Sequence, residues 1–272
     1  MNLFLKNFLE KPQLINQPNE TGNIPILCGN DYLNALNYWC SCMNLQDIYC
    51  WENAIIEKIN KNEDGIFDFS KNIIDIGAGI GEYCWLTNFN HAYAFEPCKS
   101  IRFMFEANTL IQGKVNKIDI FACGISNENK ICYFDGWELD ALPEQRSKFR
   151  DPLKYNEITE GDIQLRTLDS FNFTNIGLIK IDIEGHELEA IQGMIGTLVR
   201  NDYPPILIEI WTEDVYVERL GESGREKRKK LLKLIDDLGY DIDWWYGDWE
   251  TYLCKHRSHD YICTKNSEDS SE

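Results

Sequence analysis

Two short apolar runs in the second half of the chain end in ionisable side chains. The residues that close or follow these runs are Lys180, Asp182, Glu184, His186 and Glu209. If both runs are parallel strands of one sheet, their carboxyl ends meet at one edge, which is where open α/β sheets bind ligands. Carboxylate and imidazole groups can take a proton from an acceptor, and a lysine can do so when burial lowers its pKa. The cluster therefore predicts general-base chemistry, with Asp182 and His186 as the candidate bases and Lys180 and Glu209 as further catalytic candidates.

The same edge could instead bind a divalent cation. Asp182, Glu184 and Glu209 would supply the carboxylate oxygens that such ions prefer, and a bound cation would acidify an acceptor hydroxyl. Each of these residues could also be structural, for instance Asp182 as a helix cap. The residue types alone leave these alternatives open.

A glycine-rich turn follows another apolar run. The segment Ile73–Glu82 has the sequence I-I-D-I-G-A-G-I-G-E, in which a predicted strand enters a turn and then a helix. Glycine lets the backbone come close to a ligand, and a helix N-terminus offers free amide donors. A dinucleotide turn has the spacing G-x-G-x-x-G, whereas here it is G-x-G-x-G, and Glu82 takes the place of the third glycine. A carboxylate there opposes a pyrophosphate but is compatible with S-adenosylmethionine, which carries no phosphate.

Two further strand ends complete a predicted cofactor site. Glu96 ends the second predicted strand, where a carboxylate can accept hydrogen bonds from both ribose hydroxyls, and Asp75 suits the cofactor ammonium, directly or through water. The third predicted strand ends at Ala122 and Cys123, the expected floor for an adenine. The predicted cofactor-binding residues are Asp75, Gly77, Ala78, Gly79, Gly81, Glu82, Glu96, Pro97, Ala122 and Cys123.

With these residues in place, the chain resembles the FkbM family of methyltransferases, whose better-known members methylate hydroxyls of sugars and polyketides. The matching pieces are I-I-D-I-G-A-G-I-G-E-Y-C, A-F-E-P, A-C-G, R-T-L-D-S-F and I-K-I-D-I-E-G-H-E-L-E-A-I-Q-G, at residues 73–84, 94–97, 122–124, 166–171 and 179–193. The pairing of the last two is the most specific, and the resemblance covers roughly residues 45–265. It implies S-adenosylmethionine as the cofactor, held by Asp75, Gly77, Gly79, Gly81 and Glu96.

The resemblance also implies an acceptor and a fold. The expected reaction is methylation of a hydroxyl on a sugar or other small molecule, such as a glycan or a nucleotide sugar. A nucleic-acid methyltransferase and a non-catalytic binding protein that keeps the fold are the alternatives. The expected fold is the α/β, Rossmann-like class I methyltransferase fold, with a seven-stranded, mostly parallel sheet, an antiparallel last strand and helices on both faces.

From residue 71 on, short β-branched runs alternate with helical stretches, which is typical of βαβ units. The expected strands are Asn72–Ile76, Ala92–Phe95, Ile118–Ala122, Leu178–Ile183 and Ile206–Ile210. The expected helices are Gly81–Thr87, Lys99–Leu110, Glu184–Leu198 and Arg225–Leu238. Tyr240–Lys265 should form an antiparallel pair that closes the sheet, and Ile131–Phe134 should pair with Ile163–Leu168 as an extra hairpin.

The domain organisation follows from the same alternation. Residues 1–70 are expected to form a helical N-terminal extension or cap, and residues 71–265 the methyltransferase domain. Within that domain, the polar stretch Gly136–Glu160 is a candidate lid over the acceptor, because loops of this length are usually functional or disordered. Residues 266–272 are an expected disordered tail.

The composition indicates which binding partners and which cellular compartment to expect. The chain of 272 residues has a formal net charge of -18, which repels phosphate backbones and makes nucleic acid an unlikely partner. Its 10 cysteines are scattered, so they are expected to be reduced. It has neither an apolar stretch of membrane-spanning length nor a signal-peptide pattern. We therefore expect a soluble, cytoplasmic protein without a membrane partner.

Overall fold

The β-branched runs of the sequence form five adjacent parallel strands. In the computed structural model, which describes residues 13–19, 22–28, 51–134, 149–150, 162–246 and 251–259, these strands lie side by side in one sheet. They are β3 (Asn72–Ile76), β4 (Ala92–Phe95), β5 (Ile118–Phe121), β10 (Ile176–Ile181) and β11 (Ile206–Glu209). The predicted strands are confirmed, with ends that differ by no more than two residues.

The sheet has seven strands in the order β12-β13-β11-β10-β3-β4-β5. The predicted closing pair is formed by β12 (Tyr240–Tyr246) and β13 (Thr251–His256). Strand β13 runs antiparallel to both β11 and β12, so the predicted mostly parallel sheet with one antiparallel last strand is confirmed. Strand β10 pairs with β3 on one side and β11 on the other, and this pairing brings the ends of the glycine-turn strand and the acidic strands together.

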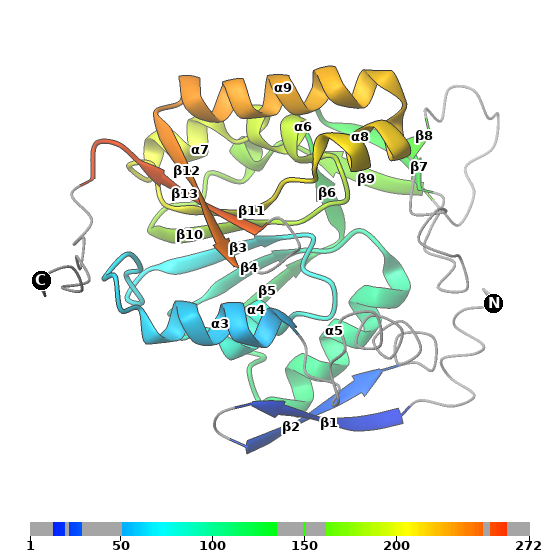
Figure 1. Ribbon diagram of the computed structural model, residues 1–272. Helices are drawn as coiled ribbons and strands as arrows, with labels where there is room; N and C mark the ends of the chain where they lie inside the picture. The colour runs from blue at the N-terminus through cyan, green and yellow to red at the C-terminus, as the bar shows by residue number, and fades with distance from the viewer. Residues whose placement is uncertain are drawn as a thin grey trace, which may run out of the picture.

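Helices cover both faces of the sheet (Figure 1). One face packs against α3 (Trp51–Lys61), α4 (Glu82–Leu86) and α5 (Lys99–Ile111). The other packs against α6 (Glu187–Gln192), α7 (Ile195–Arg200), α8 (Glu213–Leu220) and α9 (Glu222–Asp237). Alternate residues of each strand enter the two cores, so Ile73 and Leu178 face the α3–α5 side whereas Ile74 and Ile179 face the other.

The predicted helix Glu184–Leu198 is wrong in its extent. Residues 182–186 form a loop, and the rest divides into α6 and α7. Gly193 lies at the break, where an added Cβ would come 1.9 Å from the carbonyl oxygen of Ser126. A contact between segments this far apart in the chain leaves no local signal in the helical pattern.

The second half of this broken helix has a side-chain cap from the R-T-L-D-S-F motif. Asp169, in the short 3-10 helix η3 (Leu168–Phe171), accepts hydrogen bonds from the amides of Gly196 and Thr197 at 3.0 and 2.5 Å. Its carboxylate also accepts the Thr197 hydroxyl at 2.8 Å. Free amides in the first turn of a helix need such partners.

Asp169→Ala should therefore lower the free energy of unfolding by about 2 kcal/mol, because it leaves these donors without an acceptor. Urea denaturation measures this. Asp119→Ala, which removes an exposed carboxylate, is the matched control. Equal losses for the two variants would contradict the capping role.

A second, smaller sheet follows β5. It has the order β6-β9-β7-β8, with β6 (Cys123–Ile125), β7 (Lys130–Phe134), β8 (Phe149–Arg150) and β9 (Asp162–Arg166). Strands β7 and β9 pair antiparallel, which confirms the predicted hairpin. Apart from β8, the predicted lid lies outside the described residues.

The helical prediction for residues 1–70 is right only in part. Helix α3 is present, but β1 (Gln13–Asn19) and β2 (Gly22–Cys28) form an antiparallel hairpin, and β2 contacts α5. Pro18 and Pro25 lack the backbone N–H that a helix interior needs, which disfavours a helix there. The predicted tail lies outside the described residues, and in the described part of the chain no helix is long and apolar enough to cross a membrane.

Candidate active site

The glycine turn lies at the carboxyl end of β3 and is built around close approaches. Gly77 has φ +77°, and a Cβ there would come 1.9 Å from the carbonyl oxygen of Asp182. Gly81 has φ +97°, and a Cβ there would meet the ring of Phe105 at 2.0 Å. Gly79 differs, because with φ +56° an added Cβ would meet nothing within 4 Å. The turn is therefore packed against the protein at its two ends and open at Gly79.

Below this turn lies a buried carboxylate. Asp75 is fully buried; its Oδ2 accepts the Cys84 thiol at 3.3 Å, and its Oδ1 lies 3.5 Å from Lys180 Nζ. Burial raises the pKa of Asp75, and the Lys180 charge opposes this rise. Asp75 was predicted to bind a cofactor ammonium directly or through water, and in the structure it contacts Cys84 and Lys180 beneath the turn.

Lys180 connects the two strand ends. It pairs in register with Asp75, and its Nζ donates to the carbonyl oxygen of Gly77 at 2.9 Å. The same Nζ lies 3.6 Å from Asp182 Oδ2 and 5.2 Å from the centroid of the Tyr83 ring. The ammonium is thus held between two carboxylates and a carbonyl, so Lys180 fixes the glycine turn against β10. Removing one member of such a buried pair is costly, because the other charge stays buried without compensation.

Glu96 lies across the open part of the turn. Its Oε2 accepts the amide of Gly79 at 3.1 Å, and its Oε1 accepts the amide of Cys98 at 2.7 Å. Arg102 donates to the carbonyl oxygens of Glu96 and Pro97 at 3.0 and 3.3 Å and so fixes this strand end. Burial raises the pKa of Glu96 to about 7, and the two backbone hydrogen bonds oppose the rise.

The other residues predicted for the cofactor surround the same turn. Ala78 and Glu82 are buried. Ala122 is exposed and Cys123 is buried at the junction of β5 and β6. An added Cβ at Gly124 would lie 3.9 Å from Pro97, so this junction adjoins the strand end that carries Glu96. The structure thus brings the predicted cofactor residues together at one edge of the sheet.

Four carboxylates interact at the ends of β10 and β11. Burial raises the pKa of Glu209 well above its usual range, and repulsion from Asp182, Glu184 and Glu187 raises it further. Glu209 accepts the indole N–H of Trp211 at 3.0 Å. Glu187 accepts the amide of Gly185 at 3.0 Å and the hydroxyl of Tyr216 at 3.2 Å. The predicted convergence of Asp182, Glu184 and Glu209 is therefore present.

His186 faces a different set of groups. Its Nε2 lies 3.0 Å from the hydroxyl oxygen of Ser126, and its Nδ1 lies 3.5 Å from Glu189 Oε2. Burial lowers the pKa of His186 to about 4. The imidazole is neutral at neutral pH, but both of its nitrogens already have partners in the protein.

A model of the methyltransferase FkbM domain matches residues 75–242, which include the glycine turn, Glu96 and the carboxylate cluster. The chain belongs to the FkbM methyltransferase family. It is also similar to methyltransferase sdnD of Sordaria araneosa, with 22% identity over 212 residues, 65% of this chain and 76% of that protein.

Two solved structures are similar to this chain. One is the methyltransferase FkbM of Methylobacillus flagellatus KT, with 19% identity and a TM-score of 0.47 over 70% of this chain and 45% of that one. This chain thus spans less than half of the length of that protein. The other is a putative methyltransferase of Streptococcus mutans in complex with SAH, with 12% identity and a TM-score of 0.38 over 73% of this chain and 94% of that one.

The metal alternative is not supported by the arrangement of the described side chains. Asp182, Glu184 and Glu209 influence one another electrostatically. Nevertheless, among the residues that the structure describes, no group of three His, Cys, Asp or Glu side chains is placed to hold a metal ion.

Several residues of the site were missed from the sequence. Glu187 was not chosen as a candidate, although it accepts hydrogen bonds within the loop that carries Asp182. Its position in the E-G-H-E sequence was the available signal, because it adds a fourth acid to Asp182, Glu184 and Glu209. Ser126 gave no signal, because one serine after a short apolar run is unremarkable. Cys84 and Arg102 act on predicted site residues through contacts that only the fold creates.

The buried Glu187 should make the stability of the protein depend on pH. Burial raises its pKa to about 7 in the folded state, above the usual glutamate value of about 4.3 that applies to the unfolded chain. Between these two pKa values the folded state keeps a proton that the unfolded state releases. The contribution of Glu187 to the free energy of unfolding therefore falls as pH rises. Relative to wild type, Glu187→Gln should gain up to about 3 kcal/mol of stability between pH 5 and pH 8.

Urea denaturation at several pH values measures this difference. The comparison must be between variants, because His186, with its lowered pKa, contributes in the opposite sense between about pH 4 and 6.5. Glu226→Gln, at an exposed position of α9, is the matched control. A difference in the free energy of unfolding between Glu187→Gln and wild type that stays constant between pH 5 and pH 8 would contradict this role of Glu187.

Proposed function

We propose that this chain transfers the methyl group of S-adenosylmethionine to a hydroxyl group of a small molecule such as a sugar. The observation that carries the proposal is the position of Asp182. It lies beside the glycine turn, since Gly77 packs against its carbonyl oxygen, and its side chain remains partly exposed. A turn that is open to a ligand and a carboxylate that can accept a proton thus share one edge of the sheet.

The residues around the turn fit S-adenosylmethionine. A ligand can approach the backbone at Gly79, where the structure leaves open space. Glu96, which accepts the Gly79 amide, has a carboxylate that can accept ribose hydroxyls. Ala122 and Cys123 form the neighbouring strand end for an adenine. Asp75 supports the turn from below through Lys180. When bound, the cofactor supplies an electrophilic methyl group together with its own leaving group.

Asp182 is our candidate for the general base. An alcohol attacks well only if its proton leaves during the attack, and a carboxylate at hydrogen-bond distance can accept that proton. Lys180 Nζ lies 3.6 Å from Asp182 Oδ2, so one oxygen of this carboxylate faces the ammonium. Glu209 has a strongly raised pKa, so it favours the protonated form and is better suited to donate a hydrogen bond to the acceptor than to remove its proton.

The acidic composition supports a small acceptor over nucleic acid. The formal charge of -18 and the carboxylates at the acceptor edge would repel a phosphate backbone. The same repulsion disfavours a nucleotide sugar relative to an uncharged sugar or polyol. A binding protein without catalysis remains the alternative from another class, and it would retain the cofactor without transferring the methyl group.

Transfer of a labelled methyl group tests the proposal. The protein is incubated with S-adenosylmethionine labelled in its methyl group and with pools of uncharged sugars, nucleotide sugars, polyphenols and RNA. We expect label in the uncharged hydroxyl pools and none in RNA. Label in RNA alone would reject the small-acceptor proposal. Binding of the cofactor without transfer to any pool, or to a whole metabolite extract, would favour the binding protein.

A further inference from the structure

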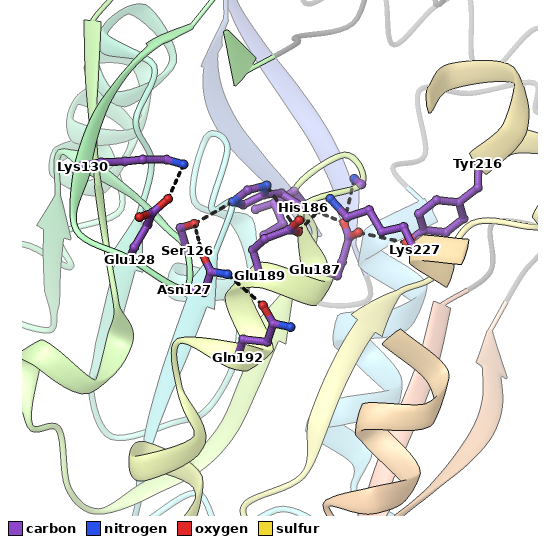
Figure 2. A network of polar contacts seen from close by, with 12 residues as sticks. Ser126, Asn127, Glu128, Lys130, His186, Glu187, Glu189, Gln192, Tyr216 and Lys227 are labelled. Carbon is purple, nitrogen blue, oxygen red and sulfur yellow. Dashed lines mark hydrogen bonds and ion pairs between the residues drawn. The ribbon is translucent and has the colours of Figure 1, made fainter. Parts of the chain in front are cut away.

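A chain of polar contacts joins the loop after β10 to the turn after β6 (Figure 2). It runs from Lys227 through Glu189 and His186 to Ser126. Lys227 Nζ lies 2.7 Å from Glu189 Oε2, which lies 3.5 Å from His186 Nδ1. This series of contacts ends at Ser126, whose hydroxyl oxygen is 3.0 Å from His186 Nε2. We call these four residues the clasp.

The far end of α6 contacts the same turn. Asn127 donates to the side-chain oxygen of Gln192 at 2.9 Å, as Figure 2 shows. At Gly193, an added Cβ would come 1.9 Å from the carbonyl oxygen of Ser126. Helix α6 is thus anchored on the Ser126–Asn127 turn at both ends, with His186 holding the end that adjoins Asp182.

The neighbours of His186 favour one of its two neutral tautomers. Glu189 Oε2 lies 3.5 Å from Nδ1, and a carboxylate oxygen attracts a ring N–H and repels a ring lone pair, so this neighbour favours the tautomer with the proton on Nδ1. The other nitrogen, Nε2, then accepts the hydroxyl hydrogen of Ser126. Lys227 Nζ lies 2.7 Å from the same carboxylate oxygen on its other side. In this tautomer the lone pair that a general base would use faces the Ser126 hydroxyl.

The order of Ser126, His186 and Glu189 is that of a hydrolytic triad, but its burial excludes that chemistry. Ser126 is only 1% exposed, so no substrate carbonyl can reach its hydroxyl. The segments that carry Ser126 and His186 indicate a structural role instead. Ser126 follows β6, which begins at Cys123 on the predicted adenine floor, and His186 closes the loop that begins at Asp182.

That loop needs an external support. Glu184 has φ +58°, which is costly for a residue with a side chain, and Gly185 has φ +94°. A strained loop keeps one conformation only when its surroundings hold it there. Glu187 holds the middle of the loop through the amide of Gly185, and His186 holds its end.

We propose that His186 is a positioning residue, which acts through Ser126 to fix the Asp182 loop relative to the strand end that carries the cofactor floor. The effect on turnover rests on the function proposed above, but the contact itself does not. Methyl transfer requires the acceptor, the base and the methyl group to be aligned, and a small misplacement of one of them slows the reaction strongly.

Two substitutions at His186 separate this role from that of a base. The glutamine that His186→Gln introduces can place an amide near the position of Nε2 and keep the Ser126 contact, but it cannot take up a proton. We expect His186→Ala and Ser126→Ala each to lower kcat about 10- to 100-fold, with S-adenosylmethionine affinity within about twofold of wild type. His186→Gln should restore kcat to within about threefold of wild type. His91→Gln, at an exposed pair, is the matched control.

A catalytic role of His186 as the base predicts a different pattern of losses. If His186 is the base, His186→Gln will be as slow as His186→Ala, by about 10²- to 10⁴-fold, and Ser126→Ala will retain wild-type turnover. A double variant Ser126→Ala/His186→Ala gives a further check, because residues that act through one contact have non-additive effects. Additive losses would overturn the proposal.

Nitrogen NMR of the imidazoles tests the clasp without any acceptor or cofactor. The chain has only 4 histidines, so the His186 signals can be assigned by substitution. We expect a neutral ring with the proton on Nδ1 that does not titrate between pH 5.5 and 8, and a changed signal in Ser126→Ala. A ring protonated on Nε2, or one that titrates near pH 6.5, would overturn the proposal even if the protein proved to be no methyltransferase.

Discussion

Gly77→Ala should destabilise the protein by about 2–5 kcal/mol and abolish binding of S-adenosylmethionine. The new Cβ would lie 1.9 Å from the carbonyl oxygen of Asp182 and 2.8 Å from Ile183 Cγ2. The left-handed backbone costs about 1–2 kcal/mol for a residue with a Cβ, and forced repacking adds about 1–3 kcal/mol. Because the clashing atom is backbone, relief requires the ends of β3 and β10 to move apart.

Two other glycines provide controls for this result. Gly113 has φ +65° and Gly79 has φ +56°, and an added Cβ at either position would meet nothing within 4 Å. Gly113→Ala should thus show the conformational cost alone, without loss of cofactor affinity. Gly79→Ala should be about as stable as Gly113→Ala in urea denaturation but should bind the cofactor poorly, since its methyl group enters the space assigned to that ligand. A Gly77→Ala variant as stable as Gly113→Ala would contradict the packing described for the turn.

Asp182→Asn should lower kcat by about 10²- to 10⁴-fold while leaving the affinity for S-adenosylmethionine nearly unchanged. The amide keeps the size of the side chain but cannot accept the acceptor's proton, and proton transfer is a contribution of this size. The substitution also leaves Lys180 with Asp75 as its remaining carboxylate neighbour, at 3.5 Å, so the glycine turn keeps its support.

Turnover with the acceptor pool that shows methyl transfer measures this effect, and calorimetry measures cofactor affinity. Asp119→Asn, at an exposed pair with His91, is the matched control. Unchanged turnover in Asp182→Asn would remove Asp182 as the base, and a parallel loss of cofactor affinity would assign it to binding instead.

The sequence predicted the parallel strands well because their residues carry a local signal. The apolar run Asn72–Ile76 followed by glycines is typical of a buried strand that enters a turn. Glu96 was chosen as a candidate cofactor residue because it follows the next strand. The order of the sheet then brought Glu96, Asp182 and Glu209 to one edge, as parallel βαβ units must.

Long-range contacts account for what the sequence could not predict. The break between α6 and α7 depends on Ser126 and Asp169, which lie far away in the chain. The orientation of His186 depends on the same serine, so a residue chosen as a candidate base has its nitrogens occupied. Asp75 was assigned to the cofactor from its place at the strand end, and its contacts with Cys84 and Lys180 come from the fold. No periodicity or motif spacing in a single sequence encodes these contacts.

Calorimetric titration with S-adenosylmethionine tests the central claim most directly. The account predicts one binding site in the wild-type protein and no binding of NAD. Glu96→Gln should weaken S-adenosylmethionine binding by about 1.5–3 kcal/mol, the value of hydrogen bonds to a charged group. Wild-type protein that binds NAD and not S-adenosylmethionine, or a Glu96→Gln variant with unchanged affinity, would contradict the assignment of the glycine turn and Glu96 to this cofactor.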